Sequence, residues 1–183
     1  LFLAPPPPLP PARLPFFSPP YTYNGGAILQ AENLGLSAFG SYTELQGQPS
    51  LFAYAVLRAP LGGPPFLFVT GLAAGMGFNR SLSIPDIDQV ASFPLVQEAI
   101  DQSASLSNFS QTADAMATWM PPELGGFFLA AGVRFSSFEL VDSFVLLTVA
   151  FGQDLSVNLL GLSTLKVPTP VSSDGSAAVD PIA

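Results

Sequence analysis

The residues of this chain that could do chemistry are carboxylates, because histidine and cysteine are both absent. Without histidine the chain lacks the commonest general base and metal ligand, and without cysteine it lacks thiolate chemistry and disulfides. Asp86 and Asp88 are the closest pair of acids, and no lysine or arginine lies between Arg80 and Arg134. The other acids of this segment are Glu98, Asp101, Asp114 and Glu123.

A pair of carboxylates can hydrolyse a glycoside or contribute to an oxygen-ligated Ca²⁺ site. No EF-hand loop or Gly-Asp repeat surrounds Asp86 and Asp88, however, and the glycine-rich run at 71–77 lacks the spacing of a phosphate-binding loop. We favour a simpler interpretation, an acidic and solvated helical face on which Asp86 caps a helix. The sequence therefore predicts no catalytic residue, no metal site and no cofactor.

Composition narrows the classes of partner. The 183 residues are 49% apolar and only 10% charged, against about 25% charged residues in a typical soluble domain. So few charges indicate that much of the surface faces other protein, lipid or an apolar ligand. The net charge is −8 and the five cations are scattered, which excludes nucleic acid as a partner. No apolar run is long enough for a transmembrane helix. The compartment is not determined, and an extracellular or cell-surface location is favoured.

The elements that must position these residues are those of a mainly β (α+β) domain. We expect an antiparallel sheet of about six strands, interrupted by a two-helix insertion at 84–122. The strands are expected at 34–45, 51–59, 66–78, 127–138, 141–151 and 155–167. The helices are expected at 94–103 and 109–120, the second with an apolar face formed by Phe109, Ala113, Met116 and Met120.

The domain has a boundary on each side. Residues 1–26 form a proline-rich linker or arm in which the sequence NGG at 24–26 marks a turn. The β-rich domain spans 27–168, and 169–183 form a flexible, disordered tail. Residues 8–13 also fit a PxxPxR pattern for SH3-type grooves, although a stiff linker is the better interpretation.

Both faces of the strand expected at 141–151 are apolar. Val145 and Leu147 point one way and Phe144 and Leu146 the other, because side chains alternate along a strand. A sheet with one wet face would alternate apolar and polar residues instead. We therefore expect both faces to be covered, one by the helices and the other by a second sheet, a neighbouring domain or bound lipid.

Two sets of residues are candidate sites. An apolar groove would be lined by Phe66, Phe68, Trp119, Phe127, Phe135 and Phe144, although core packing is the default role of aromatic side chains. Arg134 lies in an apolar strand and needs a partner if it is buried, so we expect a structural ion pair with Glu139 or Asp142. The pattern LAAG, two residues, then Phe occurs at 72–78 and 129–135. It suggests a duplicated strand pair, but small apolar residues also recur by chance in such a composition.

Several runs are similar to the family known as domain of unknown function 6603. They are FVTGLAAG at 68–75, GFNRSL at 77–82, IP at 84–85, AAGVRF at 130–135, FEL at 138–140 and LLGLS at 159–163. The resemblance covers 53–168. It implies a segment of a very large β-rich protein, mostly from bacteria and fungi, and it implies no activity and no site residue.

Three functions follow, in order of preference. The first is a non-enzymatic structural or interaction module that packs against flanking domains or identical copies through apolar sheet faces and strand edges. The second is a groove that binds or transfers a hydrophobic ligand or lipid. The third is a hydrolase that depends on carboxylates alone.

Overall fold

The computed structural model describes residues 22–31, 34–101, 109–152 and 154–166. These residues form a seven-stranded antiparallel sheet and three short helices, which confirms a mainly β fold with one strand and one helical turn more than expected. The strands are β1 (Tyr23–Ala31), β2 (Leu34–Leu45), β3 (Gln48–Gly62), β4 (Phe68–Arg80), β5 (Pro122–Ser137), β6 (Val141–Phe151) and β7 (Ser156–Leu165). The PxxPxR run and the tail at 169–183 lie outside the described residues.

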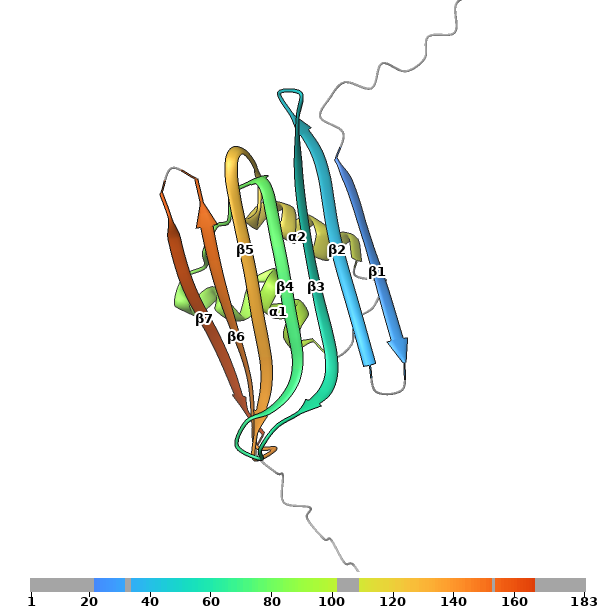
Figure 1. Ribbon diagram of the computed structural model, residues 1–183, viewed down its shortest axis with the longest axis vertical. Helices are drawn as coiled ribbons and strands as arrows, with labels where there is room; N and C mark the ends of the chain where they lie inside the picture. Colours follow the sequence, from blue (N-terminus) through green and yellow to red (C-terminus); the bar gives the residue numbers. More distant parts are fainter. Residues whose placement is uncertain (1–21, 32–33, 102–108, 153, 167–183) are drawn as a thin grey trace, which may run out of the picture.

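The strands follow one another across the sheet in chain order, so each one pairs with its sequence neighbours (Figure 1). The helices interrupt this meander between β4 and β5, yet β5 still returns to lie beside β4. Such an order leaves β1 and β7 as edges, and it brings residues at matching heights into rows that run across the whole sheet.

The strand that the sequence pattern did not reveal is β1. Residues 24–26 lie inside it rather than in a turn, and Gly25 is directly opposite Gly40 of β2. Asparagine and glycine favour turns locally, but pairing with a neighbouring strand overrides that preference. A tight turn lies between β2 and β3, where Gln46 and Gly47 have φ angles of 54° and 77°. The boundary expected at residue 26 therefore falls within the sheet.

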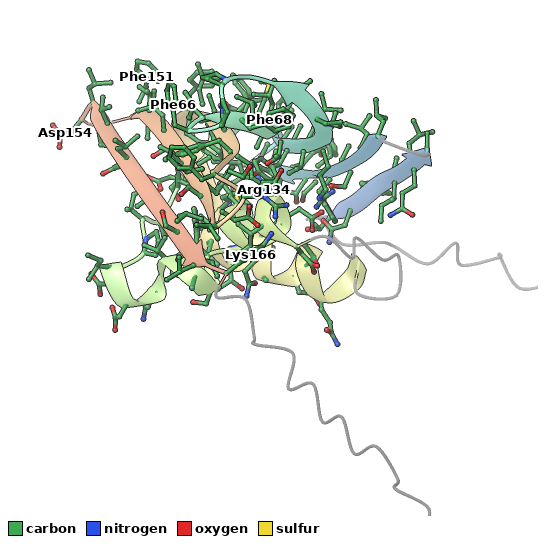
Figure 2. The ribbon with its side chains drawn as sticks, turned by 90° about the horizontal axis from the view of Figure 1, so that it is seen from below. Phe66, Phe68, Arg134, Phe151, Asp154 and Lys166 are labelled. Carbon is green, nitrogen blue, oxygen red and sulfur yellow. The ribbon has the colours of Figure 1, made fainter. Side chains whose placement is uncertain are left out.

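All three helices lie on one side of the sheet (Figures 1 and 2). They are the 3₁₀ helix η1 (Ile87–Ser92), α1 (Pro94–Ile100) and α2 (Phe109–Trp119). Asp86 occupies the N-cap position of η1, as expected, but its side chain makes no capping hydrogen bond. Pro94 occupies the first turn of α1, where a missing N–H costs nothing. Met116 and Met120 are buried as expected.

The core lies between the sheet and these helices, and small residues in β4 and β5 make room for it. Phe128 lies over Gly77, where an added Cβ would come within 2.2 Å of the ring, and Phe144 lies over Gly132, where it would come within 2.5 Å. Both phenylalanine side chains are fully buried. The glycines therefore serve close packing of aromatic rings onto the backbone of a neighbouring strand.

The repeated LAAG pattern lies on the two central strands. Ala74 is directly opposite Ala131, and the two copies of the pattern are offset by the same 57 residues that separate this pair. A local two-fold axis through the pair and normal to the sheet therefore relates the copies. It keeps Gly75 and Gly132 on the core side. This arrangement fits a duplication of the strand pair.

Candidate functional site

The acids of the helical segment do not assemble into a centre for chemistry. Asp86, Asp88 and Asp114 are exposed. No group of three acidic side chains close enough to hold a metal ion occurs in the part of the chain that the structure describes. Glu98 is buried, and it is occupied by an ion pair with Arg58.

Arg58 of β3 attaches α1 to the sheet. Its Nε donates to the carbonyl oxygen of Asp101 at 2.9 Å, and a second hydrogen bond runs to the carbonyl oxygen of Glu98. These carbonyls belong to the last turn of the helix, where they have no partner within the helix. The Glu98 carboxylate accepts from Arg58 at 3.1 Å and from the Ser37 hydroxyl at 2.7 Å. The network satisfies a buried charge and a helix end together.

Arg80 of β4 does the same for α2. Its side chain is only 2% exposed, and it donates to the carbonyl oxygen of Met120 at 2.9 Å and to the Ser41 hydroxyl at 3.0 Å. Burial lowers the pKa of the Arg80 guanidinium, because the charged form loses solvation. The negative end of the helix dipole offsets part of that cost. Two of the five cations in the sequence thus bind the carbonyl oxygens at helix ends. The only indication of this role in the sequence was an arginine inside an apolar strand.

Tyr54 provides a third attachment. Its hydroxyl donates to the carbonyl oxygen of Leu95 in α1 at 2.6 Å. Burial, and then the charge of Glu98, raise the pKa of the Tyr54 hydroxyl well above its ordinary value. All three attachments join the helices to the sheet, although the buried Nε of Arg80 has no hydrogen-bond partner in the described part of the chain.

The predicted partner of Arg134 is present but shared. Asp142 Oδ2 lies 3.7 Å from Arg134 and 2.6 Å from Lys166 Nζ. Glu139 is exposed, in a turn where Phe138 and Glu139 have φ angles of 50° and 59°. Arg134 is directed to the helix side of the sheet, near Lys166 (Figure 2).

The six aromatic residues proposed for a groove divide between different parts of the molecule. Phe144 is buried in the core, and Trp119 packs edge-to-face with Phe93 at a centroid distance of 5.3 Å. Phe127 and Phe135 point to the opposite side of the sheet, while Phe66 is exposed in the β3–β4 connection. Phe68 is partly buried and opposite Ser136. These six side chains do not line one common groove, so ligand binding stays a prediction.

The most unusual surface is the side of the sheet away from the helices, here called the open face. It consists of four rows of cross-strand partners that begin in β1, pass through Leu36, Ala38, Gly40 and Tyr42 of β2, and continue to β6 or β7. The rows contain no charged residue. Their exposed large side chains are Tyr23, Leu29, Leu36, Tyr42, Leu72, Met76, Phe78, Leu129, Leu147, Phe151, Val157 and Leu159. Figure 2 shows Phe151 on this side.

The sequence matches one family model over residues 12–180 of the 183-residue chain. That model describes a family of unknown function, DUF6603. The chain belongs to the DUF6603 family. No curated protein and no solved structure matches it. No helix among the described residues of this DUF6603 chain is long and apolar enough to cross a membrane.

The size of the open face of this DUF6603 chain follows from sheet geometry. Seven strands about 4.8 Å apart span roughly 29 Å, and four rows about 6.8 Å apart span roughly 20 Å. The product is roughly 600 Å², at the upper end of the largest apolar patch on a typical monomer. One partner in a standard protein interface buries about 800 Å². An uncharged patch of this extent has the dimensions of an interface.

Proposed function

We propose that this DUF6603 chain is a non-enzymatic packing module of a larger β-rich protein or assembly. Its open face packs against the apolar sheet face of a neighbour, which is a flanking domain or an identical copy. The observation that supports the proposal is the open face itself, four uncharged rows with exposed leucine, phenylalanine and methionine side chains.

The energetics favour covering this face. Removing roughly 600 Å² of apolar surface from water contributes about 15 kcal/mol at 25 cal/mol per Å². Association costs about 4–15 kcal/mol in lost translational and rotational freedom. A flanking domain on the same chain avoids much of that cost, because the connection supplies a high effective concentration. Two sheets that pack this way lie about 10 Å apart, so their side chains interdigitate.

The sheet edges offer a second route for continuation. β1 and β7 each have one neighbour, and neither contains a charged residue or a proline. Natural edge strands are commonly protected by lysine, proline or bulges, because free N–H and C=O groups pair readily with another strand. Edges without such protection suit a sheet that extends into an adjoining repeat.

A dye that fluoresces on exposed apolar surface tests the proposal. We expect the isolated chain to bind the dye, and Leu72→Lys combined with Leu129→Lys to abolish binding, because both side chains lie in the open face. Ile87→Lys is the matched control, since Ile87 is 93% exposed on the helix side. A longer chain that includes the flanking sequence should bind no dye. Equal dye binding by the double variant and the control would contradict the proposal.

Native mass spectrometry distinguishes packing from the hydrophobic-ligand alternative. A gently purified chain that carries a near-stoichiometric apolar molecule would favour ligand binding. Homo-oligomers or complexes without added small-molecule mass would favour the packing module.

A further inference from the structure

A cavity of about 570 Å³ lies at one end of the sheet, where its lining comes from the β1–β2 pair, the end of β3 and the β5–β6 hairpin. Ligand pockets commonly measure about 300–1,000 Å³. Three of the five lysine and arginine residues line it, namely Arg58, Arg134 and Lys166. This concentration is notable in a chain whose net charge is −8. The acids in the lining are Glu139 and Asp142, and Arg58 is already paired with Glu98, which lies outside the lining.

The three cations are not equally available. Arg58 is engaged by the last turn of α1 and by Glu98. Lys166 holds Asp142 at 2.6 Å, and this close pair leaves Arg134 with a contact of 3.7 Å, beyond hydrogen-bond range. The Arg134 side chain is nevertheless only 12% exposed. A guanidinium has five N–H donors, and such a buried group is stabilised when a carboxylate or phosphate binds two of them.

The rest of the lining is largely apolar. Ile28 lies in its wall, together with Ala59 and Pro60. A second cavity of about 290 Å³ also contacts Arg134 and Asp142, and its lining includes Phe144 and Leu162. The cationic side chain of Arg134 thus lines two cavities whose walls are partly apolar.

We propose that this site binds an anionic amphiphile, a single alkyl chain with a carboxylate or phosphate headgroup. Arg134 binds the headgroup in a bidentate manner, and Lys166 adds a second positive charge at the exposed rim. The alkyl chain lies against Ile28, Ala59 and Pro60. This binding site is separate from the packing role, which does not depend on it. The buried Arg134 guanidinium, with no partner closer than 3.7 Å among the described residues, selects an anionic ligand, whereas the open face shows no preference for charge.

Calorimetric titration with decanoate, decyl phosphate and decanol, each below its micelle concentration, tests the site. We expect both anions to bind and decanol to bind at least tenfold more weakly, because a charged hydrogen bond typically contributes at least one order of magnitude in affinity. The comparison of the two anions identifies the preferred headgroup. Equal affinities for decanoate and decanol would overturn the proposal.

Two variants locate the site. Arg134→Gln should weaken decanoate binding at least tenfold, and Arg134→Lys should recover part of it. Asp142→Asn removes the competing carboxylate, so it should strengthen binding even if Arg134→Gln fails to fold. The open-face variant Leu72→Lys with Leu129→Lys should leave decanoate affinity within twofold. Decanoate affinity unchanged by Asp142→Asn, or lost in the open-face variant, would refute the assignment.

Discussion

Replacing Gly77 with alanine should destabilise the fold by forcing a methyl group into the ring of Phe128. The added Cβ would lie 2.2, 2.6 and 2.8 Å from three carbons of that ring. The ring has little room to move, because Phe128 is fully buried and its centroid is 6.2 Å from that of Phe52. Overpacking of this kind costs about 1–3 kcal/mol. We expect a loss of about 2 kcal/mol, which corresponds to roughly 4–8 °C in melting temperature.

The assay is urea unfolding followed by circular dichroism, with Gly161→Ala as the matched control. Gly161 is also a strand glycine, but a Cβ there meets no atom within 4 Å. The control should be neutral or stabilising by up to about 1 kcal/mol, because alanine loses less entropy on folding. Phe128→Leu should relieve the overlap, so the double variant should show favourable coupling of at least about 0.5 kcal/mol. Equal stabilities of Gly77→Ala and Gly161→Ala, or no coupling, would refute the packing argument.

Three further outcomes are expected. Arg58→Met should lower the free energy of unfolding by about 3 kcal/mol in urea titration, because it leaves the buried Glu98 carboxylate unpaired. Adding Glu98→Met should recover part of this lost stability. No recovery in the double variant would contradict the explanation by an unpaired carboxylate. Tyr54→Phe tests how folding stability depends on the ionisation of Tyr54. The pKa of Tyr54 is raised in the folded protein, so the stability that its hydroxyl contributes is complete below the unfolded pKa of about 10. Above that pH this contribution is lost by up to about 1.4 kcal/mol per pH unit. The difference in the free energy of unfolding between wild type and Tyr54→Phe, measured at pH 8–11, should shrink above pH 10. A constant difference would be inconsistent with a raised pKa of Tyr54. Asp86→Asn should change stability by less than about 0.5 kcal/mol, and a larger loss in thermal melting would mean that Asp86 has a structural partner.

The regular strands were the most predictable part of the fold. The ranges expected at 34–45 and 141–151 coincide with β2 and β6. Turn signals bound both ranges, and β-branched and aromatic residues are frequent in 141–151. The two faces of β6 were also assigned correctly: Phe144 and Leu146 are buried, and Leu147 is exposed on the open face. The alternation of side chains therefore predicted which residues share a face of this strand, but not which face packs against the helices.

What escaped prediction depends on contacts between distant parts of the chain. The sequence at the start of β1 predicted a turn, because Gly25 and Gly26 have no strand preference of their own. Only the pairing with β2 makes these residues extended. The helix-end contacts of Arg58 and Arg80 span about forty residues of sequence in each case, so no local pattern shows them. The proposed six-residue groove failed to assemble for the same reason, since residues from five segments divide between the two sides of the sheet.

Sedimentation velocity of the isolated chain tests the open face most directly. We predict concentration-dependent self-association of the wild-type chain, because the apolar side chains of its open face are exposed. The Leu72→Lys and Leu129→Lys double variant should be monomeric at the same concentrations, with an unchanged melting temperature. The Ile87→Lys control should associate like the wild type. A wild-type chain that stays monomeric at high concentration, or a double variant that associates equally well, would contradict the claim that this face is an interface.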